Sequence, residues 1–340
     1  MPQKDKNSAS PAEANNAPKS ILGKEKSRYE SKGFGLFFAI LQVVAFYYYY
    51  PILMKVFWAR MLLLMEEYQM SHSLFYLLFG FINSIIFVIM IQGFYTLCYQ
   101  LELPIIERYK CLEEPWPWNE DLEAWNKLFW RSSVLYSFNV LCLNPFAYAL
   151  HYLFDIPLEL DFTMEGLPDS GKMCGQILFC MFVEDLTFHF SHRLLHTRTL
   201  YKYIHKIHHE HKVTISIAGQ YAHPLEYIFG NLLPAAMGVM ILSYRIHFVT
   251  AFTWYTLRYI ESSEGHSGYE FSWSVFRVLP FGSDFGYHAY HHSHNIGNYS
   301  SFFTIWDSVF GSNKAYYEYL HERKETDSED KKALGKTKQA

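Results

Sequence analysis

The chain has 340 residues and a formal net charge of −4; 50% of its residues are hydrophobic and only 18% are charged. This composition excludes an intrinsically disordered protein, which needs low hydrophobicity and high charge. The small negative charge provides no general basic field for nucleic acid, so no nucleic-acid partner is expected. The five cysteines form no close metal-type pair and indicate no disulfide framework.

Residues 1–32 are polar and rich in Ser, Asn and Pro, and we expect a disordered tail rather than a cleaved signal peptide, because no apolar core is present. Three runs without Asp, Glu, Lys or Arg follow, at 33–54, 70–101 and 132–154. Each is long enough for a helix that crosses ~30 Å of hydrocarbon. Buried helices of a soluble protein are the weaker alternative, since such helices ordinarily alternate with polar faces.

A fourth crossing is expected through 173–190, although Glu184 and Asp185 interrupt it. The stretch 227–257 carries only Arg245 as a charge and is too short for two full spans, so a hairpin that dips into the bilayer fits it best. The sequence therefore predicts an all-α integral membrane protein with about four transmembrane helices and a membrane-dipping hairpin. The basic residues of the tail and of 193–212 favour the cytosol for both termini and for the region after the fourth crossing.

Histidine is the unusual component, because 14 of the 17 histidines lie between His189 and His294. Eight of them form three clusters, and on an α-helix residues three and four apart share one face. We therefore expect each cluster to direct its imidazoles at one point. Imidazole is the commonest side-chain metal ligand, so the clusters predict a metal site. The clusters are His192 and His196; His205, His208 and His209; and His288, His291 and His292.

Two further histidines, His223 and His266, flank the hairpin and bring the candidate ligands to ten, more than one octahedral ion takes. Two metal ions with positions left for oxygen or water suit this number. No cysteine lies near the clusters, whereas structural zinc prefers cysteine. A nitrogen-rich, open site favours iron and dioxygen chemistry, although ligand type alone leaves zinc and copper open.

The remaining histidines of this region receive other roles. His211 and His294 lie six residues after the first histidine of their clusters, which is about 240° around a helix, so they are expected to face away. His189 shares a helical face with His192 and is a weaker candidate ligand. His247 lies in an apolar run and is expected to be a core residue with satisfied hydrogen bonds.

A redox metal pair at the cytosolic face of a membrane can meet the apolar part of a lipid. Oxidation of an unactivated C–H bond needs a stronger oxidant than any acid–base side chain. The sequence holds no dinucleotide or P-loop fingerprint, so we expect the electrons to come from a partner protein.

At these residues the chain resembles the fatty acid hydroxylase superfamily of membrane di-iron oxygenases, and within it most closely the methylsterol monooxygenase family. The resemblance covers roughly residues 100–320 and is carried by 192–211, 221–226, 266–271 and 296–312. It implies an enzyme of the endoplasmic-reticulum membrane that oxidises a sterol 4-methyl group. It also implies two iron ions, dioxygen, and electrons from NAD(P)H through a cytochrome b-type carrier and its reductase. The implied ligands are His192, His196, His205, His208, His209, His266, His288, His291 and His292, with His223 less secure.

Two departures from the family pattern concern the substrate. The third cluster usually has Asp after its first histidine, whereas this chain has Ala289. The segments 266–273, 279–282 and 291–295 resemble cholesterol 25-hydroxylases, so hydroxylation of a sterol side chain or another lipid is an alternative. A histidine-rich metal transporter or a non-catalytic sensor is an alternative of another class. A transporter places ionisable ligands inside its spans, but the three apolar runs hold only His72 and His151.

The expected organisation is a tail at 1–32, a transmembrane region at 33–190, a histidine-box domain at 191–312 that includes the hairpin 227–257, and a charged tail at 313–340. Near the end, Lys336 and Lys338 resemble a retrieval signal of endoplasmic-reticulum membrane proteins. Such a signal requires an exposed, mobile segment.

Overall fold

The computed structural model describes residues 32–112 and 114–337, and over these residues the protein is helical, with three isolated β-bridges and no strand. The predicted all-α class is confirmed. The predicted tail, apart from residue 32, and Lys338 of the retrieval-like pattern lie outside the described residues.

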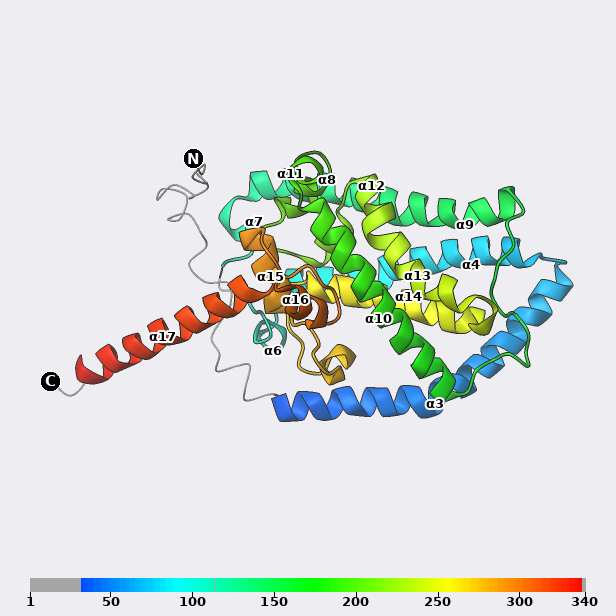
Figure 1. Cartoon of the computed structure of the whole chain (residues 1–340), viewed down its shortest axis with the longest axis horizontal. Helices are drawn as coiled ribbons and strands as arrows, with labels where there is room; N and C mark the ends of the chain where they lie inside the picture. Colours follow the sequence, from blue (N-terminus) through cyan, green and yellow to red (C-terminus); the bar gives the residue numbers. More distant parts are fainter. Residues whose placement is uncertain (1–31, 113, 338–340) are drawn as a thin grey trace, which may run out of the picture.

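Long helices form most of the molecule (Figure 1). The first, α3 (Lys32–Glu67), bends part-way along its length, and Pro51 inside it removes a backbone donor and favours such a bend. Helix α4 begins after Ser71, whose side chain accepts the N–H of Leu74. The bounds of the next segments are α4 His72–Phe87, η1 Val88–Gln92, α5 Gly93–Leu101, α6 Pro104–Glu107, α7 Pro117–Glu120, α8 Leu122–Phe138, η2 Asn139–Leu143 and α9 Asn144–Leu153.

Helix α4 lies against α9, and the approach is close at Gly80. A Cβ atom at this position would lie 2.2 Å from the ring of Tyr148, so only glycine allows the two helices to meet in this way. A similar contact joins α10 (Ser170–Leu195) to α13 (Leu233–Leu242), where a Cβ on Gly238 would lie 2.7 Å from the Cα of Cys180. Small residues at these crossings allow the backbones to pack tightly.

Four helical segments are long and apolar enough to cross a membrane: Gly33–Glu67, His72–Leu101, Leu122–Leu153 and Pro224–Arg245. The first three include all of the predicted runs except residues 70, 71 and 154. The stretch 173–190 of α10, expected as the fourth crossing, is not among these four. Glu184 and Asp185 of α10 are fully buried, and they bond to other parts of the protein. The two acids face the interior of the protein, whereas Leu178, Phe182 and Phe190 of the same helix are exposed.

The expected hairpin at 227–257 is a pair of helices that extends beyond those bounds. Its first arm includes Pro224–Arg245, and its second arm is α14 (Phe248–Gly265). His247 starts the second arm: its Nδ1 accepts the N–H of Val249 and its Nε2 donates to the carbonyl of Thr163. The predicted core role of His247 is confirmed.

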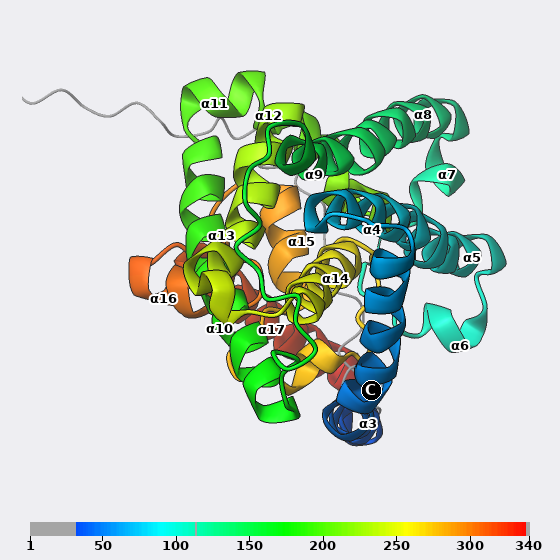
Figure 2. The ribbon, with the colours of Figure 1, turned by 90° about the vertical axis from the view of Figure 1, so that its right-hand side faces the viewer.

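Helix α14 lies between the α10–α13 pair and the α4–α9 pair in the end-on view (Figure 2). Aromatic rings fill this centre, with Phe248 and Phe252 of α14 against Tyr76 and Phe79 of α4. The C-terminal ends of α10 and α14 therefore reach the same end of the molecule.

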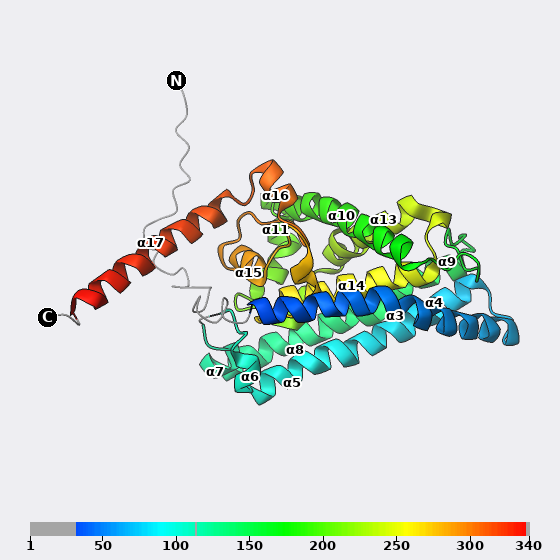
Figure 3. The same ribbon diagram turned by 90° about the horizontal axis from the view of Figure 1, so that it is seen from below.

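Shorter segments gather at that end, and α17 projects away from it (Figure 3). The charged segment expected at 313–340 is helical over Lys314–Thr337, and this helix is α17. The remaining bounds are α11 Arg198–Tyr203, η3 His205–Glu210, η4 Ser216–Gln220, α12 Pro224–Glu226, η5 Tyr227–Leu232, η6 Ser243–Arg245, η7 Val275–Val278, α15 Phe285–His294, α16 Ile305–Phe310 and α17 Lys314–Thr337.

Candidate metal centre

Nine of the ten predicted ligands come together in two groups at the end of the molecule where α10 and α14 finish. In each group the candidate ligand atoms all lie within 4.8 Å of one another. The first group is His192, His196, His205, His209 and His291, and the second group is His208, His266, His288 and His292.

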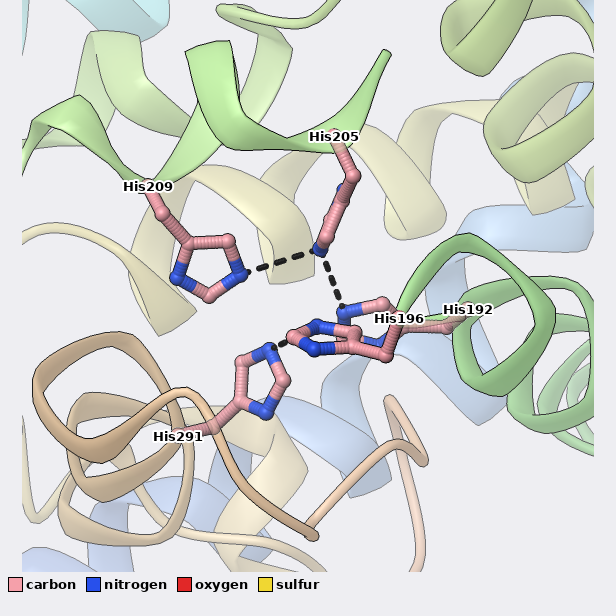
Figure 4. Close-up of side chains that lie close together, drawn as sticks. All are labelled: His192, His196, His205, His209 and His291. Atoms are coloured by element: carbon pink, nitrogen blue, oxygen red, sulfur yellow. Dashed lines mark hydrogen bonds between the residues drawn. The ribbon is translucent and has the colours of Figure 1, made fainter. Parts of the chain in front are cut away.

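Three elements supply the first group (Figure 4). His192 and His196 come from the end of α10, His205 and His209 from η3, and His291 from α15. The Nε2 atoms of His192 and His205 are 3.2 Å apart, and those of His205 and His209 are 3.0 Å apart. The Nε2 atoms of His196 and His291 are separated by 3.2 Å. The rings thus converge through the same ring atom.

The second group has the same design. His208 comes from η3, His266 is the residue that ends α14, and His288 and His292 lie one turn apart on α15. The Nε2 atom of His266 is 2.9 Å from that of His288 and 3.4 Å from that of His208. The Nε2 atoms of His288 and His292 are 3.1 Å apart.

The expectation that each cluster directs all its rings at one point is wrong for two of the three clusters. Adjacent residues divide between the groups: His208 and His209 of η3 contribute to different groups, and so do His291 and His292 of α15. Segment η3 is also a 3-10 helix rather than an α-helix. Neighbouring side chains on such a helix point about 120° apart, which suits a segment that lies between two sites.

The other ring nitrogen of five histidines faces an oxygen acceptor. In the first group, the Nδ1 atoms of His192 and His291 lie 2.9 and 2.6 Å from the carbonyl oxygens of Tyr299 and Gly297. The Nδ1 atom of His205 lies 2.7 Å from Oε1 of Glu226.

In the second group, the Nδ1 atom of His208 lies 3.1 Å from the carbonyl oxygen of Tyr221. That of His266 lies 2.8 Å from the carbonyl oxygen of Ser262. A carbonyl only accepts, so each of these Nδ1 atoms carries the ring proton and donates it.

This proton assignment leaves lone pairs facing one another. A neutral imidazole with its proton on Nδ1 is an acceptor at Nε2. The Nε2 atoms of His208 and His266 therefore meet at 3.4 Å without a proton between them. A cation is the partner that turns such a contact from repulsive to favourable. The donor set, neutral imidazoles oriented by acceptors behind them, fits a pair of transition-metal ions.

Burial keeps the rings neutral. Desolvation is the main cause that lowers the pKa of all nine histidines, and neighbouring imidazoles lower most of them further. The pKa of His208 is lowered to about 4 and that of His196 to about 2. At neutral pH these side chains offer lone pairs rather than positive charges.

The other histidines lie outside both groups. His223 caps α12 by accepting the N–H of Leu225 at its Nδ1. His189 contacts Ser300 and Asp307. His211 and His294, predicted to face away, do so: the Nε2 of His211 lies 2.7 Å from Oγ of Ser132, and His294 stacks on a tyrosine ring.

The sequence reasoning missed the groups that orient the histidines. Tyr299 and Gly297 lie in a loop after α15, and Asp185 of α10 holds this loop by accepting N–H groups from residues 301, 302 and 303 at 2.8, 2.7 and 3.2 Å. Asp307 accepts the N–H groups of Tyr299 and Ser300. The sequence does contain a signal for this orienting role, because two acidic residues interrupt the apolar pattern of α10.

The region of the chain that contains the site matches a known protein family. The fatty acid hydroxylase model matches residues 177–312, which include both histidine groups. Methylsterol monooxygenase 1 of Gallus gallus is 32% identical over 65% of this chain and 72% of its own length, and that of Danio rerio is 31% identical over 67% and 75%. Very-long-chain aldehyde decarbonylase GL1-11 of Oryza sativa subsp. indica is 40% identical over 44% of this chain and 56% of its own length. No solved structure matches the chain.

Proposed function

The chain belongs to the fatty acid hydroxylase family, and on that premise we propose that it is a membrane di-iron monooxygenase that oxidises a sterol, at its 4-methyl group. The observation that carries this proposal is the convergence of unprotonated Nε2 atoms in two adjacent groups. The names of the methylsterol monooxygenase relatives support the sterol and its methyl group.

Each histidine group would hold one iron ion. When bound, the iron pair supplies, with dioxygen and electrons, an oxidant strong enough for an unactivated C–H bond. The chain's own part is to orient the rings: Tyr299, Gly297 and Glu226 accept the Nδ1 protons in the first group and direct the Nε2 lone pairs inward. Burial of the rings keeps them neutral and excludes water from the site. His223, which caps a helix outside both groups, is not part of the proposed set.

The cellular setting follows the same premise. We place the protein in the endoplasmic-reticulum membrane, with the histidine groups and both termini on the cytosolic side, because the segment 193–212 is rich in Lys and Arg. The electrons come from NAD(P)H through a cytochrome b-type carrier and its reductase, since the sequence carries no nucleotide fingerprint of its own.

A second candidate has a specific observation in its favour. The aldehyde decarbonylase GL1-11 shares 40% identity over 159 residues, so the same site on this chain is also a candidate for a long-chain aldehyde. The two candidates differ in substrate, and the same experiment separates them.

The experiment is product analysis by mass spectrometry with purified protein in lipid, a reductant and dioxygen, given a 4-methyl sterol, cholesterol, a fatty acid or a long-chain aldehyde. We expect about two irons per chain and an oxygenated 4-methyl sterol. Oxidation of cholesterol at its side chain, or conversion of the aldehyde alone, would replace the sterol-methyl assignment. A protein that holds metal but consumes no dioxygen with any lipid would be a transporter or sensor.

A further inference from the structure

A second cavity lies within the helical layer, and none of the nine grouped histidines lines it. Its volume is about 230 Å³, and α4, α9, α13 and α14 contribute to its wall. Tyrosine rings and alanine methyl groups make up much of the lining, among them Tyr76, Tyr148, Ala147 and Ala235. Three of the four membrane-capable segments supply these residues, so the cavity lies among helices suited to lipid.

This cavity adjoins a smaller one at the metal centre. The smaller cavity has a volume of about 60 Å³ and is lined by five of the nine grouped histidines. Asn231 and Arg258 line both cavities. The junction between the apolar cavity and the histidines is therefore formed by one amide and one guanidinium side chain.

Arg258 is held in place by two carboxylates. Its Nε donates to Glu184, and its Nη1 donates to Glu261 at 2.9 Å. The guanidinium also lies over the rings of Phe188 and Phe302, with its central carbon 5.3 and 5.8 Å from their centroids. Arg258 itself is only 8% exposed. A buried ionisable residue among apolar membrane helices is costly and points to a functional contact.

Arg258 and Glu261 place a donor and an acceptor side by side at the junction, with Nη1 of Arg258 2.9 Å from Oε2 of Glu261. A hydroxyl group both donates and accepts, so it can accept from Arg258 and donate to Glu261.

We propose that the larger cavity holds the apolar body of the lipid substrate and that Arg258 and Glu261 bind a hydroxyl group of that lipid beside the histidine groups. The inference rests on the proposed function and deepens it, because it names the residues that recognise a hydroxyl group on the substrate. Arg258 and Glu261 act in this proposal as specificity-determining residues.

The cavity is tested by photo-crosslinking of a photoactivatable sterol with a free hydroxyl to the purified full-length protein. Ala147→Leu narrows the cavity, whereas Ala149→Leu is a matched control, since Ala149 lies on the same helix outside the cavity lining. We expect labelling of the wild type and of A149L, and about tenfold weaker labelling of A147L, a loss of ~1.4 kcal/mol in affinity. Equal labelling of both variants would overturn the cavity assignment.

The hydroxyl contact is tested by comparing the same sterol with its deoxy analogue. Wild type is expected to bind the hydroxyl form about 10- to 100-fold more tightly, the strength of a hydrogen bond to a charged group. Arg258→Lys keeps the charge but loses the forked donor geometry, so this preference should shrink. A purely structural role for Arg258 would weaken both ligands equally and leave the preference unchanged, which would contradict the proposal.

These measurements are binding assays, so they fail independently of the proposed reaction. If the protein oxidises a 4-methyl sterol but A147L and A149L label alike, the reaction stands and the cavity assignment falls. If the sterol binds as expected but no oxidised sterol forms, the site stands and the reaction assignment falls.

Discussion

His208 and His211 are three residues apart, yet their rings have different partners. The Nε2 of His208 lies 3.4 Å from that of His266 in the second group, whereas the Nε2 of His211 lies 2.7 Å from the hydroxyl of Ser132. Both histidines are buried, so burial alone does not separate a candidate ligand from a packing residue. The direction of the ring separates them.

The first prediction follows from this difference. His208→Ala should lower bound metal and abolish turnover, because the second group loses one of its four rings. His211→Ala should retain metal and most turnover while it lowers the free energy of unfolding by ~1–3 kcal/mol, since the buried hydroxyl of Ser132 loses its partner. Elemental analysis and thermal unfolding of both variants provide the check. Equal metal loss in both would refute the argument from ring direction.

A second residue-scale prediction concerns Glu226, the carboxylate behind His205. Glu226→Gln keeps one oxygen acceptor but replaces the other carboxyl oxygen with an NH2 donor, and it should weaken metal binding by about 10- to 100-fold, as is typical for partners of a ligating histidine. Competition with a chelator measures this affinity.

Glu210→Gln is the matched control for that measurement. The side chain of Glu210 bonds to Arg131 and to the hydroxyl of Tyr221, and among the described residues it forms no hydrogen bond or ion pair with a grouped histidine. A partly exposed pair of this kind contributes ~0–1 kcal/mol, so metal affinity should stay at the wild-type value. Chelator curves that coincide for the two variants would remove Glu226 from the site.

At the scale of elements, α10 is the helix that organises the centre. Its N-terminal end is capped by Asp169, which accepts the N–H of Lys172, and its C-terminal end supplies two histidines to the first group. Between them, Asp185 holds the loop whose carbonyls orient His192 and His291. Helix α10 thus supplies two candidate ligands from its C-terminal end, and Asp185 in its middle holds the loop that orients two of the ligands.

The third prediction compares two acids of this helix. Asp185→Ala leaves three buried N–H groups without their acceptor, so it should cost ~3 kcal/mol or more and lower bound metal. Asp169→Ala removes only a cap at the other end, at ~1 kcal/mol, with metal content unchanged. Thermal unfolding and metal content are measured together. Normal metal binding in D185A would show that the loop holds its position without this contact.

At the scale of the whole molecule, all three histidine clusters reach one end of the helical body (Figure 1). The hairpin returns α14 to the end where α10 finishes, and His266 joins a group with His208 at 3.4 Å. We therefore predict that the segments around the clusters share one side of the membrane.

The fourth prediction tests this arrangement by cysteine labelling in sealed microsomes, in a background with the exposed Cys142 replaced by serine. Tyr203→Cys and Ile296→Cys, at exposed positions beside the first two clusters and the third, should both react with an impermeant reagent from the cytosol. Glu165→Cys, in the loop before α10, should react only after permeabilisation. Reaction of residue 296 only from the lumen would contradict the shared side and the proposed site together.

The sequence by itself determined the helical class, three of the four membrane-capable segments and the histidines of both groups. These features are local: a span is a run of consecutive apolar residues, and each cluster lies within five residues of chain. The roles of His211 and His247 were also predictable from spacing and from an apolar context.

Only the tertiary structure decided how the histidines divide and what orients them. The partners of His192 and Asp185 lie 107 and at least 116 residues away along the chain, so no local pattern connects them. The same distance hides the partners of the two acids in the expected fourth crossing, because Glu184 and Asp185 bond to α14 and to the loop after α15. Where the rings of His208 and His209 point depends on the 3-10 geometry of η3 between two facing helices. Contacts between distant segments, rather than the spacing of residues within one segment, therefore decide which of the two groups each histidine joins.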